Sequence, residues 1–306
     1  MLKPCYPKVK RLRLRESAAS LALMRAKFTI DLSGRHTISL GERTLIVGVI
    51  NVTPDSFSDG GRHFDASVAI DRAIEMESEG ADIIEIGGES TRPGASAVDA
   101  QTEMARILPV IDGIVGKINL PIAVDTYKSE VAGAALAQGA SIINDVSALR
   151  FDPRLAEVAA RERAGLVLMH MRGDPANMQK MPPSGDIFAE IDIDLRQAID
   201  LAERSGLDPN RIMIDPGIGF GKTLEQNLQI INRLDRFASL GVPIMIGTSR
   251  KSFIGRLTGR QQQDRLFGTA GTVAAAILRG AHLVRVHDVK EMVDVVKVAD
   301  AIVASP

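Results

Sequence analysis

Two hydrophobic patterns divide the chain at about residue 44. Residues 28–32 and 36–40 alternate apolar and polar side chains across Ser33 and Gly34, which predicts a β-hairpin. Beyond them, short apolar runs are continuous rather than alternating, which is typical of strands buried on both faces. Eight such runs follow, at residues 45–50, 82–86, 121–124, 141–143, 165–169, 211–214, 243–246 and 283–286.

Segments with helical periodicity separate these runs. The clearest places apolar residues three and four positions apart from Ile187 to Ala202, which forms one stripe along a helix. Glycines recur between the helical segments and the next run, at positions 80, 139, 165, 206, 241 and 280. We expect each to adopt the left-handed conformation that ends a helix.

The order of these segments predicts the fold. Successive strands start 20 to 46 residues apart, which is about the length of a βαβ unit. Eight units indicate one domain over residues 28–306, a (β/α)₈ TIM barrel with the N-terminal β-hairpin plugging its lower end. An open, doubly wound sheet is the alternative, but it more often has five to seven strands.

Composition narrows the class of protein. The 306 residues are 45% hydrophobic and 25% charged, as in ordinary globular proteins. The 37 Lys and Arg residues against 38 Asp and Glu give no basic footprint for nucleic acid. The single cysteine, Cys5, excludes an intrachain disulfide and a cysteine metal cluster. With no apolar run long enough for a transmembrane helix, we expect a cytoplasmic protein that acts on a small molecule.

Residues 1–27 differ from the rest of the chain, because they hold eight basic side chains and one acid, Glu16. They lack the apolar stretch of a secretory signal. We interpret them as a disordered extension of minor functional importance. An organellar transit segment and a translation start at Met24 are the alternatives.

Polar residues follow the end of every predicted strand. In a barrel, the C-terminal ends of the strands and the loops after them form one rim, where reactive residues lie. These residues are Asn51, Gly87 to Arg92, Asp125, Asn144 and Asp145, His170 and Met171, Asp215, Arg250 and Lys251, and Arg285 to His287. A purely structural protein has no reason to gather charges there, since burying unpaired charge is costly.

Two chemical groups separate along this rim. The inner group contains Asp125, Asn144, Asp215 and Lys251, whose donors and acceptors suit a flat, amide-rich heterocycle. The outer group contains Asn51, Thr91, Arg92, Arg285 and His287, which suit a diphosphate and a metal ion. A heterocycle at one end and a diphosphate at the other suggest group transfer with diphosphate as the leaving group.

Eight segments in chain order resemble the motifs of the dihydropteroate synthase family. They are Ile50–Gly61 (INVTPDSFSDGG), Ile86–Ala95 (IGGESTRPGA), Ala123–Tyr127 (AVDTY), Ile142–Asp145 (IIND), Leu168–Met171 (LMHM), Ile214–Lys222 (IDPGIGFGK), Gly247–Phe253 (GTSRKSF) and Val284–Asp288 (VRVHD). The resemblance covers residues 28–304. It departs from the usual family pattern at Glu85, where Asp is common, and at Ile218, where Phe is frequent.

This resemblance implies an activity and a set of site residues. The family joins 7,8-dihydropterin-6-ylmethyl diphosphate to p-aminobenzoate with the aid of Mg²⁺. By resemblance, the inner group holds the pterin together with Met171 and Phe220, and the outer group holds the diphosphate. Asn51 would ligate Mg²⁺, with Asp55 and Asp59 in the same loop. The p-aminobenzoate and sulfonamide pocket would comprise Phe57, Thr91, Arg92, Pro93, Lys251 and Ser252.

The resemblance also implies a dissociative reaction, in which diphosphate leaves before the aniline nitrogen attacks. The expected catalytic residues are Asp125, Lys251, Arg285 and His287. Asp125 would stabilise the cation, while Arg285 and His287 would neutralise the leaving group. The small residues of 268–277 lie where the family usually forms a homodimer.

Several of these residues have simpler explanations when each is taken alone. Asp125 could cap a helix and Asp215 could belong to a turn. We expect His170 to be a packed histidine outside the site. The segment from Gly217 to Thr223 imitates a phosphate-binding P-loop, but Pro216 stands where that motif requires glycine. We therefore expect Lys222 to be a surface residue of a loop.

Two other functions compete with the synthase. A pterin-dependent methyltransferase domain would share the pterin ligands, but it has no use for Arg92, Arg285 or His287. A catalytically silent relative would bind pterin and should have lost diphosphate residues, none of which is missing here.

Overall fold

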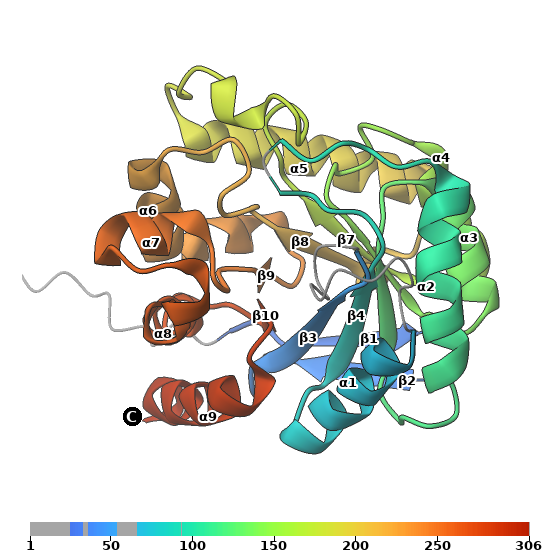
Figure 1. Cartoon of the computed structure of the whole chain (residues 1–306). Helices are drawn as coiled ribbons and strands as arrows, with labels where there is room; N and C mark the ends of the chain where they lie inside the picture. The colour runs from blue at the N-terminus through green and yellow to red at the C-terminus, as the bar shows by residue number, and fades with distance from the viewer. Residues whose placement is uncertain (1–24, 33–35, 54–65, 93, 306) are drawn as a thin grey trace, which may run out of the picture.

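The computed structural model describes residues 25–32, 36–53, 66–92 and 94–305. Its strands and helices alternate as the sequence predicts (Figure 1). The strands are β1 (Phe28–Leu32), β2 (His36–Leu40), β3 (Leu45–Asn51), β4 (Ile83–Gly87), β5 (Ile122–Asp125), β6 (Ile142–Asp145), β7 (Gly165–Met169), β8 (Ile212–Asp215), β9 (Met245–Ile246) and β10 (Leu283–Val286). The α-helices are α1 (Ala66–Glu79), α2 (Ala100–Ile114), α3 (Ser129–Ala137), α4 (Arg154–Glu162), α5 (Ile187–Arg204), α6 (Leu224–Asn232), α7 (Ser252–Thr258), α8 (Leu266–Ile277) and α9 (Val289–Ala304).

Strands β3 to β10 form one parallel sheet that closes on itself. Its strand order is β8-β7-β6-β5-β4-β3-β10-β9. The first and last strands of this order meet where Ile214 N donates to Pro243 O at 2.9 Å, beside a parallel bridge between Ile214 and Ile244. The prediction of a (β/α)₈ barrel is confirmed, with helices arranged around the strands (Figure 1).

The hairpin of β1 and β2 covers the lower end of the barrel, as predicted. Its two strands pair antiparallel, with Phe28 opposite Leu40. The alternation places Ile30, Leu32, Ile38 and Leu40 on one face, where they pack against the first inward residues of the barrel strands. Burial of this apolar face closes the lower end, so ligands reach the barrel from the opposite rim.

A larger core lies between the strands and the helices. The stripe predicted from Ile187 to Ala202 is buried on α5, including Ile191 and Leu195. No helix in the described part of the chain has the length and apolarity needed to cross a lipid bilayer.

Five of the six glycines expected to end helices have positive φ, for example Gly80 at +106° and Gly139 at +120°. Gly165 is the exception, because it is the first residue of β7. Arg163 takes the left-handed position instead, with φ of 56°.

The N-terminal boundary differs from the predicted one by three residues. Arg25 is buried, and it donates to Ala281 O at 2.9 Å and to Asp300 Oδ1 at 2.5 Å. Residues 25–27 therefore belong with the barrel, although the sequence assigns them to the extension. Residues 1–24, on which the prediction of disorder rests, lie outside the described residues.

Candidate active site

The ends of the strands bring the inner group together beneath the upper rim. Asp125, Asn144 and Asp215 stand at or next to the last residues of β5, β6 and β8, and each is buried. Neighbouring parallel strands carry their last residues to the same edge of the sheet. Asp125 and Asn144 are direct partners in the register of β5 and β6.

Arg285 joins two carboxylates in the barrel interior. Its Nε donates to Glu85 Oε1 at 2.6 Å, and a terminal nitrogen donates to Asp125 Oδ2 at 2.8 Å. Burial, followed by the nearby charge of Glu85, raises the pKa of Asp125 to about 7, and Arg285 opposes this shift. The pKa of the Arg285 guanidinium is raised, because the charges of Glu85 and Asp125 outweigh its burial.

Glu85 also orients Asn144. The amide Nδ2 of Asn144 donates to Glu85 Oε2 at 2.9 Å. A carboxylate oxygen only accepts, so this contact sets which way the amide faces. Asn144 Oδ1 is buried and has no hydrogen-bond partner among the described residues. An orphaned buried acceptor of this kind is suited to receive an N–H group from a ligand.

Lys251, the fourth member of the inner group, lies beside Phe220. The ammonium of Lys251 is 4.1 Å from the centre of the Phe220 ring and donates to Ile218 O at 2.6 Å. Burial lowers the pKa of Lys251 to about 7, and the charge of Asp215 opposes this shift. Met171 and Phe220 belong to a small apolar cluster with Met169 and Met178, which we call the apolar wall.

The outer group contains an uncharged histidine. Burial, followed by the charges of Arg285 and Arg250, lowers the pKa of His287 to about 3. Its Nδ1 lies 3.0 Å from Ser249 Oγ, which also accepts from the backbone N–H of His287. The other ring nitrogen, Nε2, faces the amide of Asn51, whose Nδ2 lies 3.5 Å away. His287 is thus uncharged near neutral pH.

A cleft of about 400 Å³ opens above these residues. Eight of the residues expected from the sequence line it: Asn51, Thr91, Arg92, Phe220, Lys251, Ser252, Arg285 and His287. Asp125, Asn144, Met171 and Asp215 are not among its lining residues and are almost fully buried. Phe57 and Pro93, with Asp55 and Asp59, lie outside the described residues.

Ser249, Gln262 and Arg265 also line the cleft and were not singled out from the sequence, while Arg250 lines it after having been placed on the rim. Ser249 and Arg250 fall within one of the eight motifs, so their position after a strand was a usable signal. Gln262 and Arg265 come from the segment between α7 and α8, which no pattern connects with the rim. Arg92, Arg250, Lys251, Arg265 and Arg285 give the cleft a cationic lining that attracts anions.

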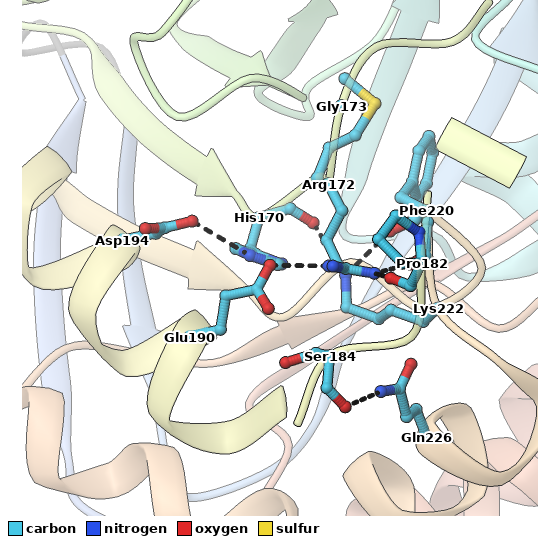
Figure 2. Close-up of polar contacts among 12 residues, drawn as sticks. His170, Arg172, Gly173, Pro182, Ser184, Glu190, Asp194, Phe220, Lys222 and Gln226 are labelled. Carbon is cyan, nitrogen blue, oxygen red and sulfur yellow. Dashed lines mark hydrogen bonds and ion pairs between the residues drawn. The ribbon is translucent and has the colours of Figure 1, made fainter. Parts of the chain in front are cut away.

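The expectations for His170 and Lys222 have different outcomes. His170 is buried, its Nε2 lies 3.3 Å from Asp194 Oδ2, and it does not line the cleft, so it is a packed histidine as predicted. The prediction that Lys222 lies on the surface is wrong. Lys222 is 6% exposed, because its side chain reaches the backbone of the loop after β7 at His170 and of its own loop at Phe220 (Figure 2).

Comparison with known proteins identifies the family. Residues 47–287 match the sequence pattern of the family described as pterin binding enzymes. A dihydropteroate synthase from Bacillus subtilis is 45% identical over 264 residues, which cover 86% of this chain and 90% of that protein. The chain belongs to the dihydropteroate synthase family.

Solved structures of this family share the fold. A dihydropteroate synthase from Xanthomonas albilineans with 4-aminobenzoic acid is 44% identical and superimposes with a TM-score of 0.85, covering 92% of this chain and 100% of that one. Another structure from Xanthomonas albilineans, in complex with 7,8-dihydropteroate, is 41% identical with a TM-score of 0.80, covering 91% and 100%. Two structures of relatives in this family thus contain 4-aminobenzoic acid and 7,8-dihydropteroate.

Proposed function

We propose that this barrel catalyses the dihydropteroate synthase reaction. It condenses 7,8-dihydropterin-6-ylmethyl diphosphate with p-aminobenzoate to give 7,8-dihydropteroate and diphosphate. The observation that carries this conclusion is the 45% identity to a dihydropteroate synthase over most of both chains. The similar synthase structures hold 4-aminobenzoic acid and 7,8-dihydropteroate. These relatives support the synthase, and they give no support to a methyltransferase or a silent pterin-binding protein.

The inner group and the apolar wall would recognise the pterin. The carboxylates of Asp125 and Asp215 can accept N–H bonds from the ring, and Asn144 Oδ1 is free to accept another. Met171 and Phe220 provide an apolar surface for the flat ring. Asp125 lies near the point where positive charge would develop on the methylene carbon, so it would stabilise that charge.

The outer group would bind the leaving group. The methylene C–O bond breaks with its electron pair on diphosphate, and the aniline nitrogen then forms the C–N bond and loses a proton. Arg92 and Arg285 would stabilise the departing diphosphate, with the neutral His287 beside them. No strong base is needed for the attack, because the aniline is neutral near pH 7.

Mg²⁺ fits the oxygen chemistry of this cleft. The ion is commonly bound through one or two protein oxygens plus substrate phosphates and water. Asn51 lines the cleft and carries an amide oxygen, while its Nδ2 lies 3.5 Å from His287 Nε2. The described residues contain no cluster of three or more His, Cys, Asp or Glu that could hold a metal without substrate. Bound through Asn51 and the substrate, Mg²⁺ would add positive charge beside the diphosphate.

The surface of α7 and α8 is the proposed homodimer contact. Phe267 on α8 is 88% exposed, and Leu257 on α7 is 53% exposed. Large exposed apolar side chains on adjacent elements can mark an interface. Phe267→Glu should then convert a dimer into a monomer in light scattering.

The bacterial relatives support the cytoplasm as the compartment in which this protein would act.

Diphosphate release tests the reaction directly. The purified protein receives dihydropterin-methyl diphosphate and Mg²⁺, with and without p-aminobenzoate. Release that requires p-aminobenzoate and yields dihydropteroate supports the proposal. Pterin binding without release would favour the silent pterin-binding protein, and no binding at all would contradict the assignment of the cleft.

A further inference from the structure

Lys222 places a buried ammonium group behind the cleft rather than in it. Its Nζ donates to the backbone carbonyl oxygens of His170 and Phe220, each at 3.2 Å (Figure 2). It also donates to Gly217 O at 2.8 Å. A lysine ammonium has three N–H donors, so all three have partners. Lys222 is not among the residues that line the cleft. It can therefore affect a ligand only through the groups that it holds.

Those carbonyl groups belong to the two loops that carry residues of the proposed pterin site. His170 directly precedes Met171 in the loop after β7, and Phe220 belongs to the loop after β8. The backbone N–H of Gly217 donates to Asp215 Oδ1 at 2.7 Å. One ammonium thus connects the backbone of Phe220, the residue that precedes Met171, and Gly217, whose N–H holds Asp215.

The loops after β7 and β8 approach each other closely at Gly217 and His170. Gly217 has φ of +70°, and a Cβ there would lie 1.9 Å from His170 O. Close packing of the backbones leaves three carbonyl oxygens converging on one point. Carbonyl oxygens repel each other electrostatically, and the ammonium at their centre converts that repulsion into attraction.

A second network holds the outer side of the same loops. Arg172 donates to Glu190 Oε1 on α5 at 2.7 Å, to Pro182 O at 2.6 Å and to Gly221 O at 3.2 Å (Figure 2). The loop after β7 is thereby attached to α5. Lys222 bonds to the carbonyl oxygens of Phe220 and His170, whose backbone N–H groups donate to Gly217 O at 3.2 Å and to Asp215 O at 2.9 Å.

We propose that Lys222 is a positioning residue for pterin recognition, holding Met171 and Phe220 at the separation that receives the ring. This inference rests on the proposed function, because it takes the inner group to be the pterin site. Lys222 determines the shape of the apolar wall, while the outer group that would bind the diphosphate lies on other loops. Its loss should therefore weaken one ligand selectively.

Lys222→Met tests the proposal, because methionine has a similar length and no donors. Titration calorimetry would measure binding of 6-hydroxymethylpterin and, separately, of inorganic diphosphate with Mg²⁺. We expect the Kd for the pterin to rise about tenfold or more, and the Kd for diphosphate to change less than about threefold. In steady-state assays, KM for the pterin substrate should rise while KM for p-aminobenzoate changes little.

Lys180→Met is the matched control, since Lys180 is exposed in the same loop after β7. It should bind both probes as the wild type does. If Lys222→Met does not fold, Lys222→Gln replaces it, because glutamine is neutral and its two N–H donors cannot serve all three carbonyl oxygens. A selective loss of pterin affinity in a folded variant supports the role.

Unchanged pterin affinity, or equal losses of affinity for both probes, overturns the positioning role of Lys222. Failure of the wild type to bind the pterin would instead contradict the proposed function, so the two failures are distinguishable.

Discussion

Glu85 holds Asn144 and Arg285 at the same time. One carboxylate oxygen accepts from Asn144 Nδ2 at 2.9 Å, and the other accepts from Arg285 Nε at 2.6 Å. The side chain is 1% exposed, so both contacts form away from bulk water. Glu85 is one of the two departures from the usual family pattern. In this chain its length lets it orient a proposed pterin ligand and a proposed diphosphate ligand together.

Removing Arg285 should destabilise the protein in a pH-dependent way. Arg285→Ala leaves the carboxylates of Glu85 and Asp125 buried without their cation, which should lower the free energy of unfolding by about 3 kcal/mol at pH 8. A raised carboxyl pKa in the folded state favours folding at low pH, and this contribution is lost as pH rises through about 7. The loss should therefore be smaller at pH 5.5. Urea unfolding at both pH values checks this, with exposed Arg204→Ala as control, and equal losses would contradict it.

Asp125→Asn should reduce turnover without unfolding the barrel. The amide keeps the shape of the side chain but removes the negative charge that would stabilise the reacting methylene group, so we expect kcat to fall about 100-fold or more. Diphosphate release measures the rate, and circular dichroism checks the fold. Asp112→Asn, at an exposed position of α2, should retain normal turnover. A near-normal rate for Asp125→Asn would remove it from the catalytic residues.

His282 should make the lower end of the barrel sensitive to acid. Its Nδ1 accepts from Ile244 N at 3.1 Å, so Nε2 carries the proton and donates to Ala26 O at 3.1 Å. Burial lowers the pKa of His282 to about 4. A lowered pKa gives stability that is present above the unfolded value near 6.5 and is lost as pH falls through about 4.

His282→Gln should therefore be less stable than the wild type at pH 7 and lose less stability on acidification. Between pH 7 and pH 4, the free energy of unfolding of the wild type should fall by about 1–3 kcal/mol more than that of the variant. Denaturant unfolding across this pH range provides the measurement. Parallel pH curves for the two proteins would show that His282 does not carry the effect.

Arg25 should matter for stability and not for turnover. It is buried against Asp300 and Ala281 O at the lower end of the barrel, which is opposite the active-site rim. Arg25→Ala should lower the free energy of unfolding by about 2 kcal/mol. A chain that begins at Met24 keeps Arg25 and should retain full activity. Thermal melting and the diphosphate assay separate the two effects, and a truncated enzyme without activity would show that residues 1–23 are needed.

Much of the fold could be predicted because its signals are local. Continuous apolar runs indicate strands buried on both faces, and their spacing leaves room for one helix each. Asp125, Asn144 and Asp215 could be placed on one rim for the same reason, since each lies at or next to the end of a parallel strand. The end of α4 at Glu162 could not be predicted in this way, because the next residue, Arg163, adopts the left-handed conformation, which residues other than glycine rarely take.

Tertiary structure alone decided how these residues are paired and charged. Arg285 meets Glu85 and Asp125, which are 200 and 160 positions away in the chain. His287 is neutral because it is buried near arginines, and Lys222 is buried because two loops converge on it. Strand periodicity reports which face a side chain occupies. Its hydrogen-bond partners and its pKa depend on distances and burial that arise only when the barrel closes.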